Sequence, residues 1–168
     1  MQGIEVGIDE VLLSREKRVA IQNEMIKKYN LPLISFTMNI PGPIKTNNEI
    51  KAAFDIGKNL ILEKLKENNI EILEVQEFNE NTGNELFISA NSSAEKIKDI
   101  TVTIEENSEL GRLFDIDVID VNFKKLSRKS FRKCLICERQ AQECGRSRKH
   151  SVEELQKKVE EILSKGAN

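Results

Sequence analysis

Two aspartates in the stretch 111–118 have the residue type and spacing of a metal site. The stretch reads Gly-Arg-Leu-Phe-Asp-Ile-Asp-Val. If it forms a strand, Asp115 and Asp117 share one face and the apolar residues around them share the other. Such carboxylates stand roughly 6–7 Å apart along the backbone, within reach of one divalent cation. Magnesium bound by this pair and by substrate phosphates is one interpretation, and two ordinary aspartates on a solvated strand are the other.

The residues just before this pair suit a phosphate ligand. Gly111 allows a close approach to the backbone, because it has no side chain. Arg112 can donate two parallel hydrogen bonds to a phosphoryl group. The stretch therefore indicates phosphoryl chemistry, with Arg112 beside the two carboxylates.

A second group of potential metal ligands lies near the C-terminal end. Cys134 and Cys137 form a C-x2-C pair, followed by Cys144 and by His150, which is the only histidine. Three thiols and one imidazole within seventeen positions resemble the ligand set of a structural zinc site. Reduced, unligated thiols are a second interpretation. A catalytic cysteine–histidine pair is a third, disfavoured because no acidic residue nearby is an obvious partner to orient the histidine.

The segment from Lys124 to Lys149 is strongly basic. It holds ten basic and two acidic residues and so carries +8, which leaves −10 for the rest of a chain whose net charge is −2. Such a block fits a phosphate-bearing ligand or an acidic partner protein better than general binding to nucleic acid. The absence of Trp and the single Tyr also argue against single-stranded nucleic acid. A basic surface in contact only with solvent is the alternative.

The composition is that of a soluble globular protein. Of 168 residues, 39% are hydrophobic and 32% are charged. No apolar run approaches the roughly 18–20 residues of a membrane span. The first residues, Met-Gln-Gly-Ile-Glu-Val, contain no basic region followed by an apolar stretch, so we expect no secretory signal, no membrane partner and a cytoplasmic protein.

Hydrophobic periodicity, turn residues and capping boxes predict four helices and four strands. The strands are expected at 31–38, 70–78, 85–91 and 113–123. Helices are expected at 9–29, from Asn47 or Asn48 to about 65, from the capping box at 92–95 to about 104, and from the capping box at 151–154 onward. The residues expected on the buried stripe of the first helix are Val11, Leu12, Val19, Met25 and Ile26, and those of the last helix are Val152, Leu155, Val159 and Ile162.

The order of these elements predicts an α+β fold. The central βαββαβ run has the ferredoxin-like order, so we expect an antiparallel or mixed sheet with helices packed on it, plus N-terminal and C-terminal helices. No repeat or low-complexity linker divides the chain. Residues 1–168 are therefore expected to form a single domain, with 124–150 as a basic, cysteine-containing appendage.

Four separated motifs resemble one protein family, the apo-citrate lyase phosphoribosyl-dephospho-CoA transferases, which are the holo-acyl-carrier-protein synthases of citrate lyase. The motifs are Leu13–Val19, Leu31–Lys45, Gly111–Val118 and the run from Cys134 to Ser151. They occur in the order of the family, and the resemblance extends from about Val11 to Leu155.

This resemblance implies a nucleotidyltransferase-type reaction. The donor would be 2'-(5''-triphosphoribosyl)-3'-dephospho-CoA, the acceptor a serine of the citrate lyase acyl-carrier (gamma) subunit, and the second product diphosphate. A malonate decarboxylase carrier, which uses the same prosthetic group, is an alternative acceptor. A non-enzymatic module with a zinc knob that binds RNA is an alternative of another class, and it would leave the aspartate pair unexplained.

Within this reaction, specific roles are expected for the residues of the four motifs. Asp115 and Asp117 would bind magnesium, and either carboxylate could help to deprotonate the serine. Arg112 would hold the transferring phosphoryl group or the diphosphate. The substrate-binding candidates are Gly111, Arg15 and Arg18 on the first helix, Lys45 in the loop after the first strand, and Arg146 and Arg148, which could serve the donor or dock the carrier.

Overall fold

The structure is a computed structural model that describes residues 1–166. In chain order these residues form α1 (Ile8–Tyr29), β1 (Leu33–Met38), α2 (Asn48–Glu67), β2 (Glu71–Glu80), β3 (Gly83–Asn91), α3 (Ala94–Glu106), the 3-10 helix η1 (Leu110–Leu113), β4 (Phe114–Ile119), α4 (Ala141–Ser147) and α5 (Val152–Gly166).

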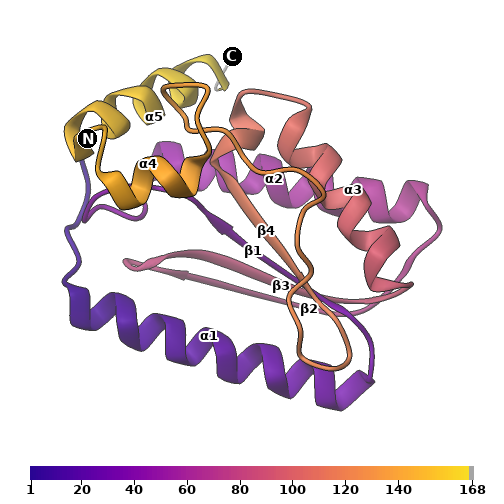
Figure 1. Ribbon diagram of the computed structural model, residues 1–168. Coiled ribbons are helices and arrows are strands. Elements are labelled where there is room, and N and C mark those ends of the chain that lie inside the picture. The colour runs from indigo at the N-terminus through magenta and orange to yellow at the C-terminus, as the bar shows by residue number, and fades with distance from the viewer. Residues whose placement is uncertain (167–168) are drawn as a thin grey trace.

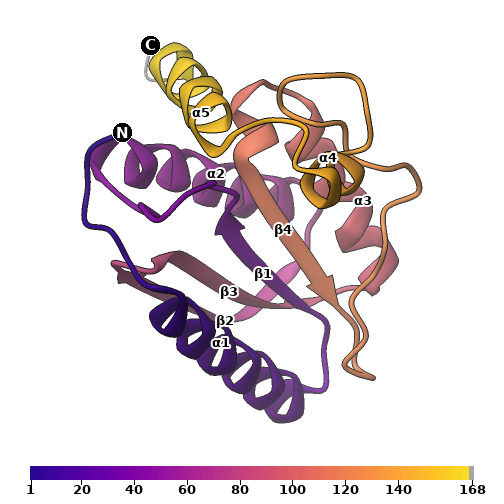
Figure 2. The same cartoon turned by 60° about the vertical axis from the view of Figure 1, so that its left-hand side comes forward.

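The strands form one open antiparallel sheet in the order β2-β3-β1-β4. This is the order of a ferredoxin-like βαββαβ arrangement, so the expected α+β fold class is confirmed. Helix α1 lies on one face of the sheet, and α2 and α3 cover the other (Figures 1 and 2). Helix α5 packs beside α2 and η1.

The main core lies between the sheet and α2 and α3. Helix α2 begins after Asn47, whose side chain accepts a hydrogen bond from the Ile50 N–H. Its buried positions are those of the predicted stripe: Ile50, Ala53, Phe54, Gly57, Ile61 and Leu65. The Phe36 ring stacks on Phe54 with centroids 4.9 Å apart, and Gly57 is needed because a Cβ there would lie 2.6 Å from the Phe36 ring. The helix therefore sits unusually close to β1.

The prediction for the buried stripe of α1 was wrong in part. Met25 and Ile26 are buried, but Leu12 and Val19 are about half exposed. The reason is that the first half of α1 faces polar side chains of the sheet rather than an apolar layer. Arg18 Nη2, for example, donates a hydrogen bond of 2.9 Å to the Glu85 carboxylate of β3.

The last strand is shorter than predicted. It ends at Ile119 instead of 123, because the Asp120 carboxylate accepts hydrogen bonds from the N–H groups of Asn122 and Lys124 and turns the chain. Phe123 adopts a positive φ of 63° in this turn. The chain then returns along the outer edge of β4, where the Leu126 N–H donates to the Val118 carbonyl.

The C-terminal part differs from expectation at two further points. Helix α4 was not predicted, because its seven residues are mostly polar and carry no clear apolar stripe. Val152 was expected to face inward, but it lies at the start of α5 and is 51% exposed. Val159, Ile162 and Leu163 form the buried side of α5.

Candidate functional site

Asp115 and Asp117 lie side by side on the α1 side of the sheet. Strand β4 alternates as predicted, with its apolar side chains buried toward α2 and α3. Asp115 pairs with Thr37 across the strands, and Asp117 pairs with Ser35. The shared face of the two carboxylates is therefore confirmed, and the neighbouring strand presents hydroxyl groups beside them.

The two carboxylates crowd each other electrostatically. Desolvation by the surrounding protein, together with the negative charge of Asp117, raises the pKa of Asp115. The positive charges of Arg132, Lys125 and Arg18 act in the opposite direction. Lys125 is the nearest of these cations to Asp117, with its Nζ 3.3 Å from a carboxylate oxygen. A divalent cation between the carboxylates would relieve the same repulsion, so this donor set fits magnesium.

A small polar cavity of about 180 Å³ opens beside Asp115, between α1 and the sheet. Its lining includes Arg15, Arg18, Lys45 and Thr37 as well as Asp115. The cations therefore come from α1 and from the loop after β1, two separate motifs of the sequence. Glu85 lines the cavity as well, so three cations face two carboxylates there, and the cavity can accept an anionic group next to Asp115.

The cations of this small cavity are held by defined contacts. The Arg18 guanidinium donates to one Glu85 carboxylate oxygen at 2.9 and 3.1 Å. The Lys45 ammonium donates to the Ile40 carbonyl at 2.8 Å. Burial, with a further contribution from the positive charge of Arg15, lowers the pKa of Lys45. A bound anion would offset the proximity of these positive charges.

A second cavity, of about 550 Å³, lies along the outer edge of β4 and also reaches Asp115. Asp117 and Lys98 line it, together with the returning segment 125–132. The two cavities thus meet at Asp115. The segment supplies basic side chains to this second cavity from Lys125, Arg128, Lys129 and Arg132.

Side chains bond to the backbone groups on the outer edge of β4. Arg132 Nη1 donates to the Phe114 carbonyl at 2.8 Å, and Lys98 Nζ donates to the Ile116 carbonyl at 3.1 Å. The Glu105 carboxylate, which is 4% exposed as a residue, accepts from the Ile116 N–H at 3.0 Å. Burial raises the pKa of Glu105, although Arg132 and the Ile116 N–H oppose this shift. These contacts tie α3 and the returning segment to the strand that carries the aspartates.

Lys125 and Arg132 were missed as site residues by the sequence analysis. In the sequence they stand out only as members of the basic segment 124–149. The usable signal was their position directly after the strand of the aspartate pair, because a chain that turns back at a sheet edge brings such residues to that strand.

Gly111 and Arg112 lie in η1, just before β4. A Cβ at Gly111 would meet the carbonyl oxygens of Ile104 and Glu105 at 2.6 Å, so the close approach that this glycine allows is to the end of α3. The Arg112 guanidinium donates to the Cys134 carbonyl at 2.6 Å. Arg112 is absent from the lining of both cavities described above. The structure therefore brings Arg112 to the cysteine segment rather than beside the carboxylates.

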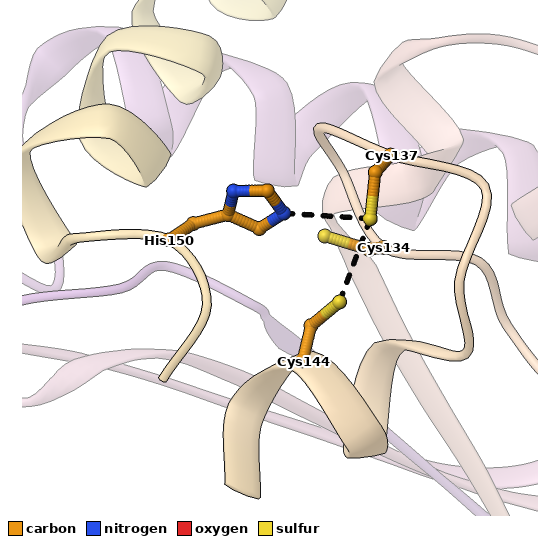
Figure 3. A group of neighbouring side chains, drawn as sticks. All are labelled: Cys134, Cys137, Cys144 and His150. Carbon is orange, nitrogen blue, oxygen red and sulfur yellow. Dashed lines mark hydrogen bonds between the residues drawn. The ribbon is translucent and has the colours of Figure 1, made fainter. Parts of the chain in front are cut away.

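Cys134, Cys137, Cys144 and His150 converge into one cluster (Figure 3). Their ligand atoms all lie within 4.8 Å of one another, so the four side chains could hold a metal ion. Cys137 Sγ is 3.5 Å from Cys144 Sγ and 3.4 Å from His150 Nε2. The hydrogen bond with His150 lowers the pKa of Cys137 to about 6, whereas desolvation raises that of Cys144 to about 11.

Arg146 and Arg148 lie at the C-terminal end of α4 and are exposed. Arg148 also lines a third cavity, of about 570 Å³, with Asn39 and Pro41 of the loop after β1. Asn39 lines the small cavity as well, so this loop stands between the two. Among residues 1–166, no helix is both long and apolar enough to cross a membrane.

Comparison with known proteins identifies relatives over nearly the whole chain. Residues 6–166 match the family model described as apo-citrate lyase phosphoribosyl-dephospho-CoA transferase. A Vibrio cholerae protein named "Probable apo-citrate lyase phosphoribosyl-dephospho-CoA transferase" is 41% identical over 164 residues, covering 95% of this chain and 92% of the relative. Proteins with the same name without that qualifier come from Citrobacter koseri, at 35% identity over 162 residues (94% of this chain, 88% of the relative), and Escherichia coli, at 34% over 163 residues (95% and 89%).

Proposed function

The chain belongs to the apo-citrate lyase phosphoribosyl-dephospho-CoA transferase family, and from this membership we propose that it attaches the phosphoribosyl-dephospho-CoA prosthetic group to the acyl-carrier (gamma) subunit of citrate lyase. The family consists of transferases, so the chain is an enzyme. The non-enzymatic RNA-binding module considered from the sequence therefore loses its basis.

The proposed reaction exchanges one phosphate bond for another. A serine hydroxyl of the carrier attacks the α-phosphorus of 2'-(5''-triphosphoribosyl)-3'-dephospho-CoA. The new bond joins the serine oxygen to that phosphorus, and the bond between the α-phosphorus and the bridging oxygen to the β-phosphate breaks. Diphosphate leaves with the bond electrons, and the serine proton passes to a carboxylate, for which Asp115 or Asp117 is the proposed acceptor, or to water.

The observation that carries this proposal is the small cavity in which Arg15, Arg18 and Lys45 surround the space next to Asp115. We propose that these three cations bind the triphosphate of the donor, with its α-phosphate nearest the aspartates. Developing charge on the phosphoryl oxygens and on diphosphate is what the site must stabilise. Cations held in advance by the sheet and by α1 supply that stabilisation without reorganising during the reaction.

Asp115 and Asp117 are the proposed ligands of Mg²⁺. Their fit rests on two carboxylates that share one face of β4. Desolvation and, after it, the negative charge of Asp117 raise the pKa of Asp115. When bound, the ion would neutralise phosphate charge. The thiols and imidazole of the cysteine cluster favour zinc instead, so we propose no magnesium there.

Arg112 lines neither cavity at the aspartates, so its proposed contact with the transferring phosphoryl group or with diphosphate requires the side chain to turn toward the donor. A guanidinium has five N–H donors, so its bond to the Cys134 carbonyl does not by itself exclude a phosphate. Gly111 packs against the end of α3, so its proposed part in substrate binding is indirect: it allows η1 to take its position. Arg112→Lys tests whether Arg112 acts through its charge alone or through paired hydrogen bonds. Lysine keeps the positive charge but lacks the parallel N–H donors of a guanidinium.

The basic segment is the proposed docking surface for the carrier. Arg146 and Arg148 are exposed at the end of α4, within the block that carries +8. A basic surface attracts an acidic carrier and orients its approach. The donor phosphates are the other candidates for contact with these two arginines.

Intact-mass analysis tests the proposal directly. Apo-carrier incubated with this protein, the donor and magnesium should gain the mass of one phosphoribosyl-dephospho-CoA group, with one diphosphate released per carrier. A carrier whose acceptor serine is replaced by alanine is the control and should gain nothing. The carrier of malonate decarboxylase should be modified far more slowly in a parallel reaction. No mass gain on the citrate lyase carrier would contradict the proposal.

A further inference from the structure

We propose that Cys134, Cys137, Cys144 and His150 bind one Zn²⁺ ion in a closed structural site, apart from the aspartate pair. All four ligand atoms already converge to within 4.8 Å of one another. Three thiolates and one imidazole form a common ligand set of structural zinc. With four protein ligands no position stays open for substrate or water, so the ion would serve the fold and not the transfer step.

The separations within the cluster agree with a tetrahedral ion. Zinc–sulfur bonds of about 2.3 Å and zinc–nitrogen bonds of about 2.0–2.1 Å require ligand atoms roughly 3.6–3.8 Å apart. Cys137 Sγ lies 3.5 Å from Cys144 Sγ and 3.4 Å from His150 Nε2. Figure 3 shows the three sulfur atoms and the imidazole pointing toward a common centre. To admit the ion, these two short separations would lengthen slightly, and the widest separation, 4.8 Å at most, would shorten.

The orientation of His150 is the second, independent observation. Its Nε2 faces the thiols, whereas its Nδ1 lies 3.6 Å from the Glu154 carboxylate on the first turn of α5. Zinc-binding histidines usually turn their other ring nitrogen toward such an acceptor, which fixes the ring and increases its basicity. The backbone also supports Cys134, because the Ile136 N–H points at its sulfur from 3.5 Å.

The ion would join three pieces of the segment 134–150. Cys134 and Cys137 lie in a turn closed by the hydrogen bond from the Cys134 N–H to the Arg139 carbonyl, which is 2.8 Å long. Cys144 comes from α4, and His150 from the connection between α4 and α5. Fixing this segment also fixes the Cys134 carbonyl that receives Arg112. Through this hydrogen bond the zinc site would help to hold η1 in place.

Two other states of the same thiols make different predictions. Three reduced thiols without metal would leave a cluster held only by weak sulfur hydrogen bonds. A disulfide between Cys137 and Cys144 would need their sulfur atoms to close from 3.5 Å to about 2.05 Å. That disulfide would leave Cys134 and His150 without a partner at the centre.

Metal analysis of the chain of residues 1–168, purified without a histidine tag or chelator, tests the proposal. We expect about one zinc per chain and the visible absorption of a tetrahedral thiolate site after exchange with Co²⁺. Cys137→Ser and Cys144→Ser should lose the stoichiometric zinc. Ser147→Ala, at the end of the same α4 helix but outside the ligand set, is the control and should retain it.

Glu154→Gln keeps the test decisive if the cysteine variants do not fold. It retains all four ligands, and competition with a chelator should show a zinc affinity about 10- to 100-fold lower. Removing the ion should speed amide hydrogen exchange in residues 133–150 while β1 and β3 stay protected. Metal-free native protein with three titratable thiols, or with a Cys137–Cys144 disulfide, would overturn the assignment. None of these measurements uses donor or carrier, so they stand independently of the transfer reaction.

Discussion

Asp115 is the residue at which the features of the site come together. It faces the small cavity of Arg15, Arg18 and Lys45 and also the larger cavity along the edge of β4. Protein atoms and the charge of Asp117 keep its pKa raised. In the proposed reaction a metal ion would balance the negative charge of this carboxylate, and Arg15, Arg18 and Lys45 would balance that of the polyphosphate.

Replacing either aspartate should abolish most of the transfer. We expect Asp115→Asn and Asp117→Asn each to lower kcat by about 100- to 1000-fold, because each removes a carboxylate from the proposed metal site. The rate of mass gain on the carrier measures this, and the circular dichroism spectrum should not change. Asp99→Asn, on an exposed position of α3, is the matched control and should keep its rate. If both variants retained normal rates and magnesium dependence, the assignment would be wrong.

Lys45 should give donor binding an unusual pH dependence. Burial lowers its pKa below the ordinary 10.5, so the ammonium loses its charge at a lower pH than a free lysine. Donor affinity should therefore fall as the pH rises from neutrality toward that lowered pKa. In Lys45→Arg the charge persists, because arginine does not deprotonate in this range. The measured quantity is the donor Kd against pH, with Lys17→Arg as the control.

Two outcomes of this experiment distinguish whether Lys45 contacts the donor. Parallel pH profiles for the wild type and for Lys45→Arg would show that Lys45 does not contact the donor. A profile that flattens only in Lys45→Arg, and not in Lys17→Arg, would support the contact.

The sequence predicted which residues belong to the candidate site better than it predicted which of them lie next to one another. Arg15, Arg18, Lys45 and Asp115 come from three distant motifs, and the structure brings them to one cavity. Arg112 is adjacent to the aspartates in sequence yet reaches the Cys134 carbonyl, because η1 turns it away before β4 begins. Neighbours in sequence share a site only if the backbone between them keeps their side chains on one side.

At the scale of elements, α1 is held over the sheet by different kinds of contact in its two halves. Its first half contacts the sheet through polar groups, and Met25 and Ile26 bury its second half. Glu74 of β2 fastens the C-terminal end, because its carboxylate accepts hydrogen bonds from the Tyr29 hydroxyl at 2.6 Å and from Lys28 Nζ at 2.9 Å. These bonds lower the pKa of Glu74 to about 2.

Glu74 should contribute stability that depends on pH. Its pKa of about 2 in the folded protein lies below the ordinary 4.5, so the contribution is complete above pH 4.5 and is lost as the pH falls through about 2. Glu74→Gln should therefore be less stable than the wild type at neutral pH, and the difference should shrink in acid. Urea unfolding across this pH range measures it, with Glu71→Gln on the same strand as control. A constant difference at every pH would contradict the assignment.

Gly111 should be required for the contact between η1 and α3. We expect Gly111→Ala to lower the free energy of unfolding by about 1–3 kcal/mol, because its Cβ would overlap two backbone carbonyls that cannot easily move. Gly145→Ala is the contrast, since no atom outside its own helix backbone and chain neighbours lies within 4 Å of a Cβ there. In a helix that change should raise stability by up to about 1 kcal/mol. Equal effects of the two substitutions in urea unfolding would refute this view of η1.

Elements with a one-sided apolar pattern were predictable, and those shaped by polar contacts were not. Every residue predicted for the buried stripe of α2 is buried, because the burial of apolar side chains alone determines which face of this helix packs on the sheet. The end of β4 depends on the Asp120 turn, and the exposed stripe of α1 depends on the polar groups it faces across the sheet. The hydrophobic periodicity of one segment does not show which side chains of another segment will pack against it.

At the scale of the molecule, we propose that the chain works as a single transferase domain in which the segment 124–150 completes the site. Its contacts support this: Arg132 bonds to β4 and η1, and Lys125 pairs with Asp117. The sequence analysis treated this segment as an appendage. Its first part runs back along β4 (Figure 2), and residues 125–132 line the second cavity.

Carrier recognition should depend on the charge of this segment. Arg146→Ala and Arg148→Ala should each raise the KM for the carrier about two- to fivefold at low salt, with the donor KM unchanged. In the wild type the carrier KM should rise with salt, and it should rise less steeply in the variants. Lys165→Ala on α5 is the control for charge loss outside the segment. An increase in donor KM would assign the two arginines to the prosthetic group.

The side chains on the outer edge of β4 also cover one of the two edges of the sheet. A sheet edge with free N–H and C=O groups is a template on which another chain can add a strand and begin aggregation. Here Arg132, Lys98, Glu105 and the Leu126 N–H occupy the outward groups of Phe114, Ile116 and Val118. The same contacts that build the wall of the site thus protect the strand from pairing with a second molecule. A variant that loosens the segment 125–132 should consequently become prone to self-association as well as slow in transfer.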